Sequence, residues 1–66
     1  MKYYAGIDIG GTNISTGIVD ENYEIVGRAK IKTDVSKGYN GVLPDIIQSV
    51  RSAAENAQLE LEEIRW

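Results

Sequence analysis

The segment from Tyr3 to Val19 most constrains the fold, because two runs of strand-forming residues meet at a pair of glycines. Residues from Tyr3 to Ile9 alternate between the two faces of an extended strand. The run from Ile14 to Val19 is again rich in β-branched residues and too short for a helix. Between them, Gly10-Gly11 would supply the positive φ angles that hairpin turns need. The sequence therefore predicts two strands joined by a tight corner.

A turn and a third strand are predicted next. Residues 20–23 are polar, and Asn22 tolerates the left-handed conformation that short hairpins require. The strand should run from Glu24 to Lys32, with one apolar face and one basic face. The basic face is most simply solvated and discourages edge pairing, and an anion patch is the less favoured alternative. The apolar face holds Ile25, Gly27, Ala29 and Ile31, and the basic face holds Arg28, Lys30 and Lys32.

One amphipathic helix is predicted after a loop over residues 33–41. Apolar residues recur there at three- and four-residue spacing, which indicates a helix from about Val42 to about Gln58. Pro44 fits the first turn of that helix, where its missing N–H costs nothing, and Asp45 complements the positive end of the dipole. The stripe expected to face the sheet consists of Leu43, Ile47, Val50, Ala54, Ala57 and Leu61.

The end of the sequence bears on domain organisation. Ile64-Arg65-Trp66 follows an acidic turn and has the composition of the start of a fourth strand. A chain of 66 residues buries only about 60% of the surface that its unfolded form exposes. We therefore expect residues 1–66 to be a truncated part of an α/β domain, with three antiparallel strands, a helix and the beginning of a fourth strand.

Composition excludes several kinds of site. The chain has no cysteine and no histidine, so disulfides, thiolate metal sites and imidazole catalysis are excluded within it. Its net charge of −3 argues against a nucleic-acid partner, because phosphate backbones require clustered Lys and Arg. No stretch resembles a signal peptide or approaches the roughly 20 apolar residues of a membrane helix. We expect a cytoplasmic protein with no membrane partner.

The glycine corner also has the chemistry of a phosphate site. Asp8 lies near the end of an otherwise apolar strand, where an unpaired carboxylate facing a dry interior would be costly, and a hydrated divalent cation would satisfy it. The N–H groups of Gly10 and Gly11 could converge on an anion. Thr12 and Asn13 add a hydroxyl and an amide. Neither the Walker loop nor the Rossmann fingerprint fits this spacing, so any phosphate would bind at a strand-to-strand corner.

The stretch GIDIGGTNISTGIVD, Gly6 to Asp20, resembles the first phosphate motif of the actin, Hsp70 and sugar-kinase superfamily. Gly-Gly-Thr at 10–12 favours the hexokinase side. With Gly17 and Asp20 at the expected offsets, the stretch is most similar to the ROK family of bacterial glucokinases, fructokinases, N-acetylmannosamine kinases and related repressors. The resemblance implies a ribonuclease-H-like, actin-like ATPase fold, whose order of elements agrees with the one predicted here. It also implies that residues 1–66 are the N-terminal part of a nucleotide-binding domain of this fold.

The resemblance implies an ATP-dependent kinase that transfers the γ-phosphoryl group of Mg-ATP to a hexose hydroxyl, most simply that of glucose. Asp8 would position Mg²⁺, mainly through water, and the residues Gly10, Gly11, Thr12 and Asn13 would hold the terminal phosphates. The catalytic base, the sugar-binding residues and a possible structural zinc motif would all follow Trp66. Residues 1–66 alone should therefore be inactive, and the whole protein a dimer or tetramer.

Three alternatives remain open. A sugar-responsive repressor of the same family would carry a helix-turn-helix ahead of the motif, and only seven residues precede Asp8, which favours a kinase if Met1 is the natural start. A non-catalytic actin-like protein or activating ATPase would also bind a nucleotide. A standalone interaction module, in which Gly10-Gly11 is merely a turn, would be indifferent to Mg-ATP.

Overall fold

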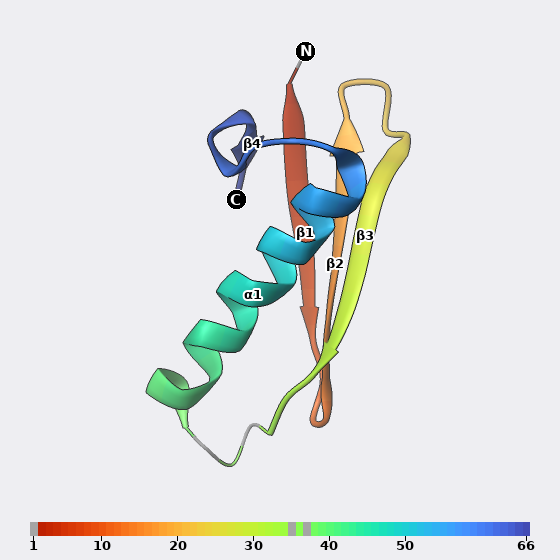
Figure 1. Ribbon diagram of the computed structural model, residues 1–66. Coiled ribbons are helices and arrows are strands. Elements are labelled where there is room, and N and C mark those ends of the chain that lie inside the picture. Colours follow the sequence, from red (N-terminus) through yellow and green to blue (C-terminus); the bar gives the residue numbers. More distant parts are fainter. Residues whose placement is uncertain (1, 35, 37) are drawn as a thin grey trace.

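A computed structural model describes residues 2–34, 36 and 38–66. In this part of the chain, a four-stranded sheet carries the helix α1 on one face (Figure 1). Strand order is β3-β2-β1-β4, antiparallel except for the parallel pair β1–β4. This confirms the predicted α/β class and order of elements. The elements are β1 (Tyr3–Ile9), β2 (Asn13–Asp20), β3 (Ile25–Lys32), α1 (Tyr39–Ala57), the 3-10 turn η2 (Leu61–Glu63) and β4 (Ile64–Arg65).

Strand pairing gives the sheet two chemically different faces. β1 and β2 pair from Tyr3 with Asp20 to Ile9 with Ile14, and β2 and β3 pair in register up to Ile18. A bulge then leaves one extra residue on β3, so that Val19 faces Ile25. The even-numbered residues of β2 are buried beneath α1, whereas its odd-numbered residues face away from the helix. We call this second side the open face.

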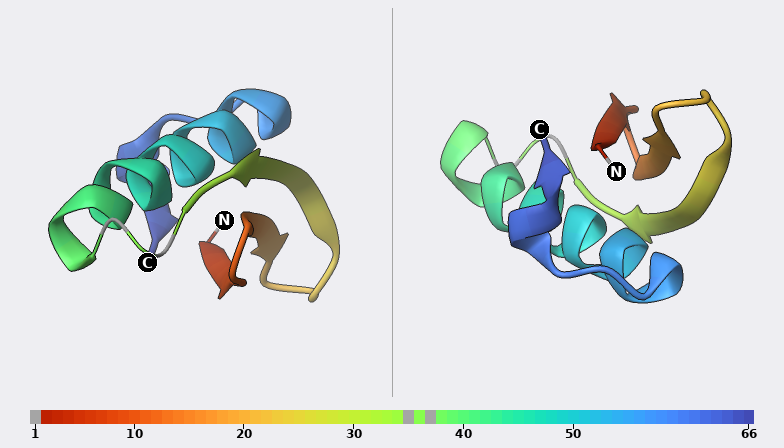
Figure 2. Two further views of the ribbon diagram at one scale, coloured as in Figure 1. Left: turned by 90° about the horizontal axis from the view of Figure 1, so that it is seen from below. Right: turned by 90° about the horizontal axis from the view of Figure 1, so that it is seen from above.

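The core lies between α1 and the strands β2 and β3, as the end-on views show (Figure 2). Gly27 of β3 marks the closest approach of helix and sheet. A Cβ atom added there would lie 2.6 Å from the Cβ of Ala57 and 2.7 Å from the carbonyl oxygen of Ala53. The small residues in the second half of α1 are therefore matched to a strand that has no side chain at this point. The buried apolar residues include Ile14, Ile18, Val50, Ala53 and Ala54.

A polar pair is buried inside this apolar layer. The hydroxyls of Thr16 on β2 and Ser49 on α1 lie 2.7 Å apart, with exposed fractions of 2% and 0%. A buried hydroxyl without a partner is costly, so each group satisfies the other. The pair fixes the position of the helix along the sheet more specifically than apolar contacts alone would.

The helix begins earlier than predicted. α1 starts at Tyr39, and the N–H groups of Gly41 and Val42 both donate to the carbonyl oxygen of Gly38. The prediction that Pro44 and Asp45 lie in the first turn is therefore wrong. Asp45 instead accepts a hydrogen bond of 2.8 Å from the Thr33 hydroxyl, which ties the helix to the end of β3.

The predicted apolar stripe is partly wrong. Leu43 is 37% exposed, and Leu61 belongs to η2 rather than to the helix. The other residues of the predicted stripe are at least half-buried. Successive helical residues are about 100° apart around the axis, and Val42 rather than Leu43 lies on the side of the sheet. The buried helical positions are Val42, Ser49, Val50, Ala53 and Ala54.

The turn before β3 also differs in detail from the prediction. Tyr23, not Asn22, has the left-handed conformation, with φ 64°. The carboxylate of Asp20 accepts hydrogen bonds from the N–H groups of Asn22 and Glu24, at 2.8 and 3.1 Å. Because this carboxylate holds Asn22 in an Asx-type turn, the positive φ falls on the next residue.

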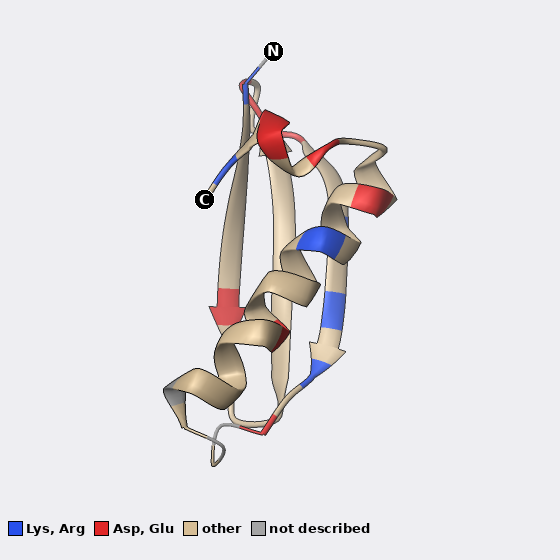
Figure 3. Cartoon of the chain, turned by 60° about the vertical axis from the view of Figure 1, so that its left-hand side comes forward, with Lys and Arg blue, Asp and Glu red and all other residues tan. Residues whose placement is uncertain are grey.

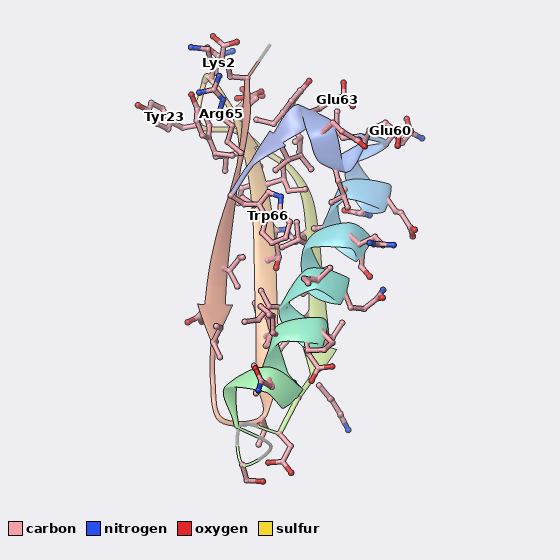
Figure 4. The ribbon with its side chains drawn as sticks, turned by 90° about the vertical axis from the view of Figure 1, so that its left-hand side faces the viewer. Lys2, Tyr23, Glu60, Glu63, Arg65 and Trp66 are labelled. Atoms are coloured by element: carbon pink, nitrogen blue, oxygen red, sulfur yellow. The ribbon has the colours of Figure 1, made fainter. Side chains whose placement is uncertain are left out.

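The predicted start of a fourth strand is confirmed. β4 pairs with Tyr3 and Tyr4 of β1. Figure 4 shows Lys2, Tyr23 and Arg65 together at this end of the sheet, opposite the hairpin between β1 and β2, while Trp66 lies on the side of α1. Among the described residues, no helix is long and apolar enough to cross a membrane.

Candidate functional site

The candidate site is the hairpin that joins β1 to β2. The Gly10 N–H donates to the Asn13 carbonyl oxygen at 2.8 Å and closes the turn. The Thr33 N–H donates to the Thr12 carbonyl oxygen at 2.9 Å, so the end of β3 supports the turn from the side. Gly10, Gly11 and Thr12 are exposed. The corner is thus held by the backbone and open to solvent.

The predicted reason for the two glycines is wrong. Gly38 is the glycine with positive φ in the described chain, and neither Gly10 nor Gly11 adopts such an angle. A Cβ at Gly11 would meet nothing within 4 Å, and one at Gly10 would lie 3.4 Å from the Asn13 carbonyl oxygen, an ordinary contact. The turn therefore does not require glycine here. What the glycines provide is unobstructed backbone on the outside of the corner.

The donors of the corner are fewer than predicted. The Gly10 N–H is used by the hairpin, whereas those of Gly11 and Thr12 have no acceptor within the described residues. The side-chain amide of Asn13 donates to the Thr12 hydroxyl oxygen at 3.1 Å, which leaves the hydroxyl proton free to bond another group. The corner thus offers two backbone N–H groups and a hydroxyl to an incoming anion.

Asp8 lies on the open face and is exposed, so the prediction of a carboxylate facing a dry interior is wrong. The reason is that α1 covers the other face of β1. Asp8 pairs in register with Ser15, two residues beyond the hairpin, and within the described chain its carboxylate makes no hydrogen bond or ion pair. It is free to bind a cation or the water around one.

The described residues contain no cluster of three or more carboxylates that could hold a metal ion without other ligands. Mg²⁺ commonly uses one or two protein carboxylates together with water and substrate phosphates. A single free carboxylate at the same end of the sheet as two free N–H groups is compatible with that mode. Asp8, Gly11 and Thr12 are therefore brought to one end of the sheet, as predicted, while the roles assigned to them stay predictions.

Sequence reasoning missed one part of this region. Arg28 and Lys30 of β3 lie on the open face, where Lys30 pairs with Ser15 and Ser15 pairs with Asp8. The sequence shows that the basic residues share a face of β3. It does not show that this face is also the face of Asp8, because that depends on the pairing of three strands.

The solved structures that are similar to this chain include two proteins. A ROK family glucokinase from Streptomyces griseus, in complex with glucose and AMPPNP, has a TM-score of 0.70 and 34% identity, over 88% of this chain and 18% of the glucokinase. Component A of (R)-2-hydroxyglutaryl-CoA dehydratase from Acidaminococcus fermentans has a TM-score of 0.72 and 28% identity, over 97% of this chain and 22% of its own. No family model and no curated protein sequence matches the chain.

These similarities confirm the predicted resemblance and the fold. The chain has the ribonuclease-H-like architecture of actin-like ATPases. Its structural similarity to the ROK family glucokinase covers 88% of the chain and is therefore not confined to the hairpin. It spans about a fifth of the length of the two proteins. The similarity therefore supports a kinase-like parent only in outline.

Proposed function

We propose that this chain is the phosphate-binding segment of an ATP-dependent sugar kinase that transfers the γ-phosphoryl group of Mg-ATP to a hexose hydroxyl, with glucose as the first candidate. One observation carries the proposal. The free carboxylate of Asp8 and the free N–H groups of Gly11 and Thr12 lie at the same end of the sheet, in a corner whose glycines the fold does not require.

Each group has a distinct part in this proposal. The N–H groups of Gly11 and Thr12, with the Thr12 hydroxyl, would donate hydrogen bonds to terminal phosphate oxygens. Asn13 would hold that hydroxyl in place through the 3.1 Å contact. Asp8 would accept hydrogen bonds from the water around Mg²⁺, and the bound cation would neutralise phosphate charge. Phosphoryl transfer depends mainly on such positioning, so this corner is half of an active site.

The sugar-kinase assignment rests on the glucokinase similarity at 34% identity. In this proposal the catalytic base and the hexose-binding groups lie outside residues 1–66, and the segment alone is inactive. A zinc motif, a dimeric or tetrameric assembly and a cytoplasmic location are further expectations of the ROK resemblance and stay predictions.

A second candidate is a nucleotide-binding protein without sugar-kinase activity. Its support is the dehydratase component, which matches 97% of this chain with a TM-score of 0.72. The discriminating assay is ADP release by a longer protein that carries this segment, with and without glucose, fructose or an N-acetylated hexose. Release stimulated by a sugar supports the kinase, and release indifferent to every sugar supports the second candidate.

The metal role of Asp8 can be tested on the 66-residue chain itself. ATP binding is measured by calorimetry with Mg²⁺ and again with EDTA, for the parent and for Asp8→Asn. We expect Mg²⁺ to tighten binding to the parent and this gain to fall about tenfold in the variant. Glu55→Gln, which removes an exposed carboxylate from α1, is the control and should behave as the parent. An equal gain in the Asp8 variant would remove Asp8 from the metal role.

A further inference from the structure

A hollow of about 560 Å³ lies on the open face of the sheet. Its floor is formed by Gly6 and Gly17, which pair with each other across β1 and β2. Asp8 and Ser15 border it toward the hairpin, and Arg28 and Lys30 border it along β3. It therefore adjoins the proposed phosphate corner but is built largely from other residues.

The two floor glycines are not needed by the strands. Neither has a positive φ angle, and a Cβ at either would meet nothing within 4 Å. Glycine in the interior of a strand weakens it, and such a glycine often marks a place where a ligand or another backbone approaches closely. Here its effect is to keep the middle of the open face free of side chains.

The charge around the hollow is opposite in sign to that of the chain. The formal net charge of the chain is −3, yet the hollow is lined by two cations, Arg28 and Lys30, and by a single carboxylate, that of Asp8. Neither basic side chain forms an ion pair within the described residues. Basic residues follow β3 while acidic residues gather around η2 and the end of α1 (Figure 3). A small anion would therefore be attracted to this part of the surface.

The simpler explanation is that the basic side chains prevent pairing at the free edge of β3. The contact between β3 and α1 weakens this explanation at Arg28. The Arg28 N–H, on the free edge, donates to the side-chain oxygen of Asn56 at 3.0 Å, so α1 already occupies the edge at this residue. The basic side chains project from the open face instead, beside Gly17 and Ser15.

We propose that the hollow is a second anion subsite, which takes a phosphate group through the Arg28 guanidinium, the Lys30 ammonium and the Ser15 hydroxyl. The inference rests on the proposed function, because the subsite would receive either the phosphate chain of the nucleotide held at the hairpin or a separate small phosphate. Arg suits this role because its planar fork binds a phosphate through two parallel hydrogen bonds. The glycine floor lets the anion approach the sheet.

The test is a titration of the ¹⁵N-labelled 66-residue chain with inorganic tripolyphosphate and, separately, with orthophosphate, followed by NMR. We expect shifts at Ser15, Gly17 and the β3 amides, and about threefold weaker binding in Arg28→Met or Lys30→Met, rising to about tenfold in the double variant. Lys2→Met and Arg65→Met remove cations at the opposite end of the sheet (Figure 4) and should bind within twofold of the parent.

Gly17→Val is a second, independent variant. It fills the hollow with a side chain that favours strands, so the fold should be retained while tripolyphosphate no longer binds in the hollow. The inference would be overturned if the parent bound neither phosphate in the hollow. It would also be overturned if the double variant and Gly17→Val bound tripolyphosphate there as tightly as the parent does. If shifts at Gly11 and Thr12 persist in those variants, the proposed function survives without the subsite.

The same titration separates the two sources of phosphate. If tripolyphosphate changes the amide chemical shifts of both the hairpin and the hollow while orthophosphate changes only those of the hollow, the result supports one continuous path for the nucleotide phosphates. Shifts in the hollow alone with both ligands support a separate small phosphate, and then the hairpin role is the one that fails.

Discussion

The contact between α1 and β3 gives the sharpest stability prediction, at Gly27. In Gly27→Ala, the new methyl would lie 2.6 Å from the Cβ of Ala57, 2.7 Å from the Ala53 carbonyl oxygen and 3.0 Å from the Ala57 nitrogen. Carbon atoms pack at about 3.5–4.0 Å, so helix and strand must separate by roughly 1 Å. Two of the three obstructing atoms belong to the helix backbone, which cannot rotate away as a side chain would.

Separation of this size loosens the packing of the buried residues Ile18, Ala53 and Ala54. Overpacking a well-packed core typically costs about 1–3 kcal/mol. A domain of this size has little stability in reserve, so the loss should be a large fraction of the total. The effect should appear as a lower urea midpoint with an unchanged slope, measured by far-UV circular dichroism.

Gly6→Ala and Gly11→Ala are the matched controls for this substitution. Their methyl groups would meet nothing within 4 Å and their φ angles are ordinary. They should leave the free energy of unfolding within about 0.5 kcal/mol or raise it slightly, because alanine restricts the unfolded chain. If Gly27→Ala is as stable as these controls, the close approach of α1 to β3 is refuted.

Two further substitutions probe the helix. Ser49→Ala should lower the free energy of unfolding by about 1–3 kcal/mol, because it leaves the buried Thr16 hydroxyl without a partner. Adding Thr16→Val should recover part of that loss. If the effects of the two substitutions in urea melts are strictly additive, a direct hydrogen bond is refuted. Pro44→Ala should raise the free energy of unfolding by about 1 kcal/mol or more, since proline in the second turn removes a helical hydrogen bond; an unchanged thermal midpoint would argue against the start of α1 at Tyr39.

Local patterns predicted the strands well and the helix start poorly. Alternation and β-branched residues predict a first strand from Tyr3 to Ile9, and these are the bounds of β1 in the structure. The predicted start near Val42 follows from the apolar repeat and from the preference of proline for a first turn, whereas α1 begins at Tyr39, where the carbonyl oxygen of Gly38 accepts hydrogen bonds from the N–H groups of Gly41 and Val42. The left-handed residue Tyr23 is not evident from the sequence, because it depends on the hydrogen bonds that the Asp20 carboxylate accepts from Asn22 and Glu24.

The sequence predicted which residues form the candidate site, but not whether they are buried or exposed. The residues of the corner could be named from the sequence, but which face of β1 the helix covers depends on contacts between distant segments. Asp8 was therefore expected to face the interior although it is exposed. The hollow beside it was missed because Gly6, Gly17 and Arg28 become neighbours only through the register of three strands.

That register also ties the candidate site to the core. Asp8 faces solvent because it pairs with Ser15, on the side of the sheet opposite to Ile14 and Ile18. A slip of one residue between β1 and β2 would put Asp8 on the same face as these two isoleucines. Either Asp8 would then turn toward α1, or Ile14 and Ile18, which are fully buried, would turn to the open face. Burial of each such side chain contributes about 1.5–3 kcal/mol, far more than an exposed carboxylate gains from its place on the open face. The apolar residues beneath the helix, rather than any contact made by Asp8 itself, therefore hold this carboxylate beside the phosphate corner.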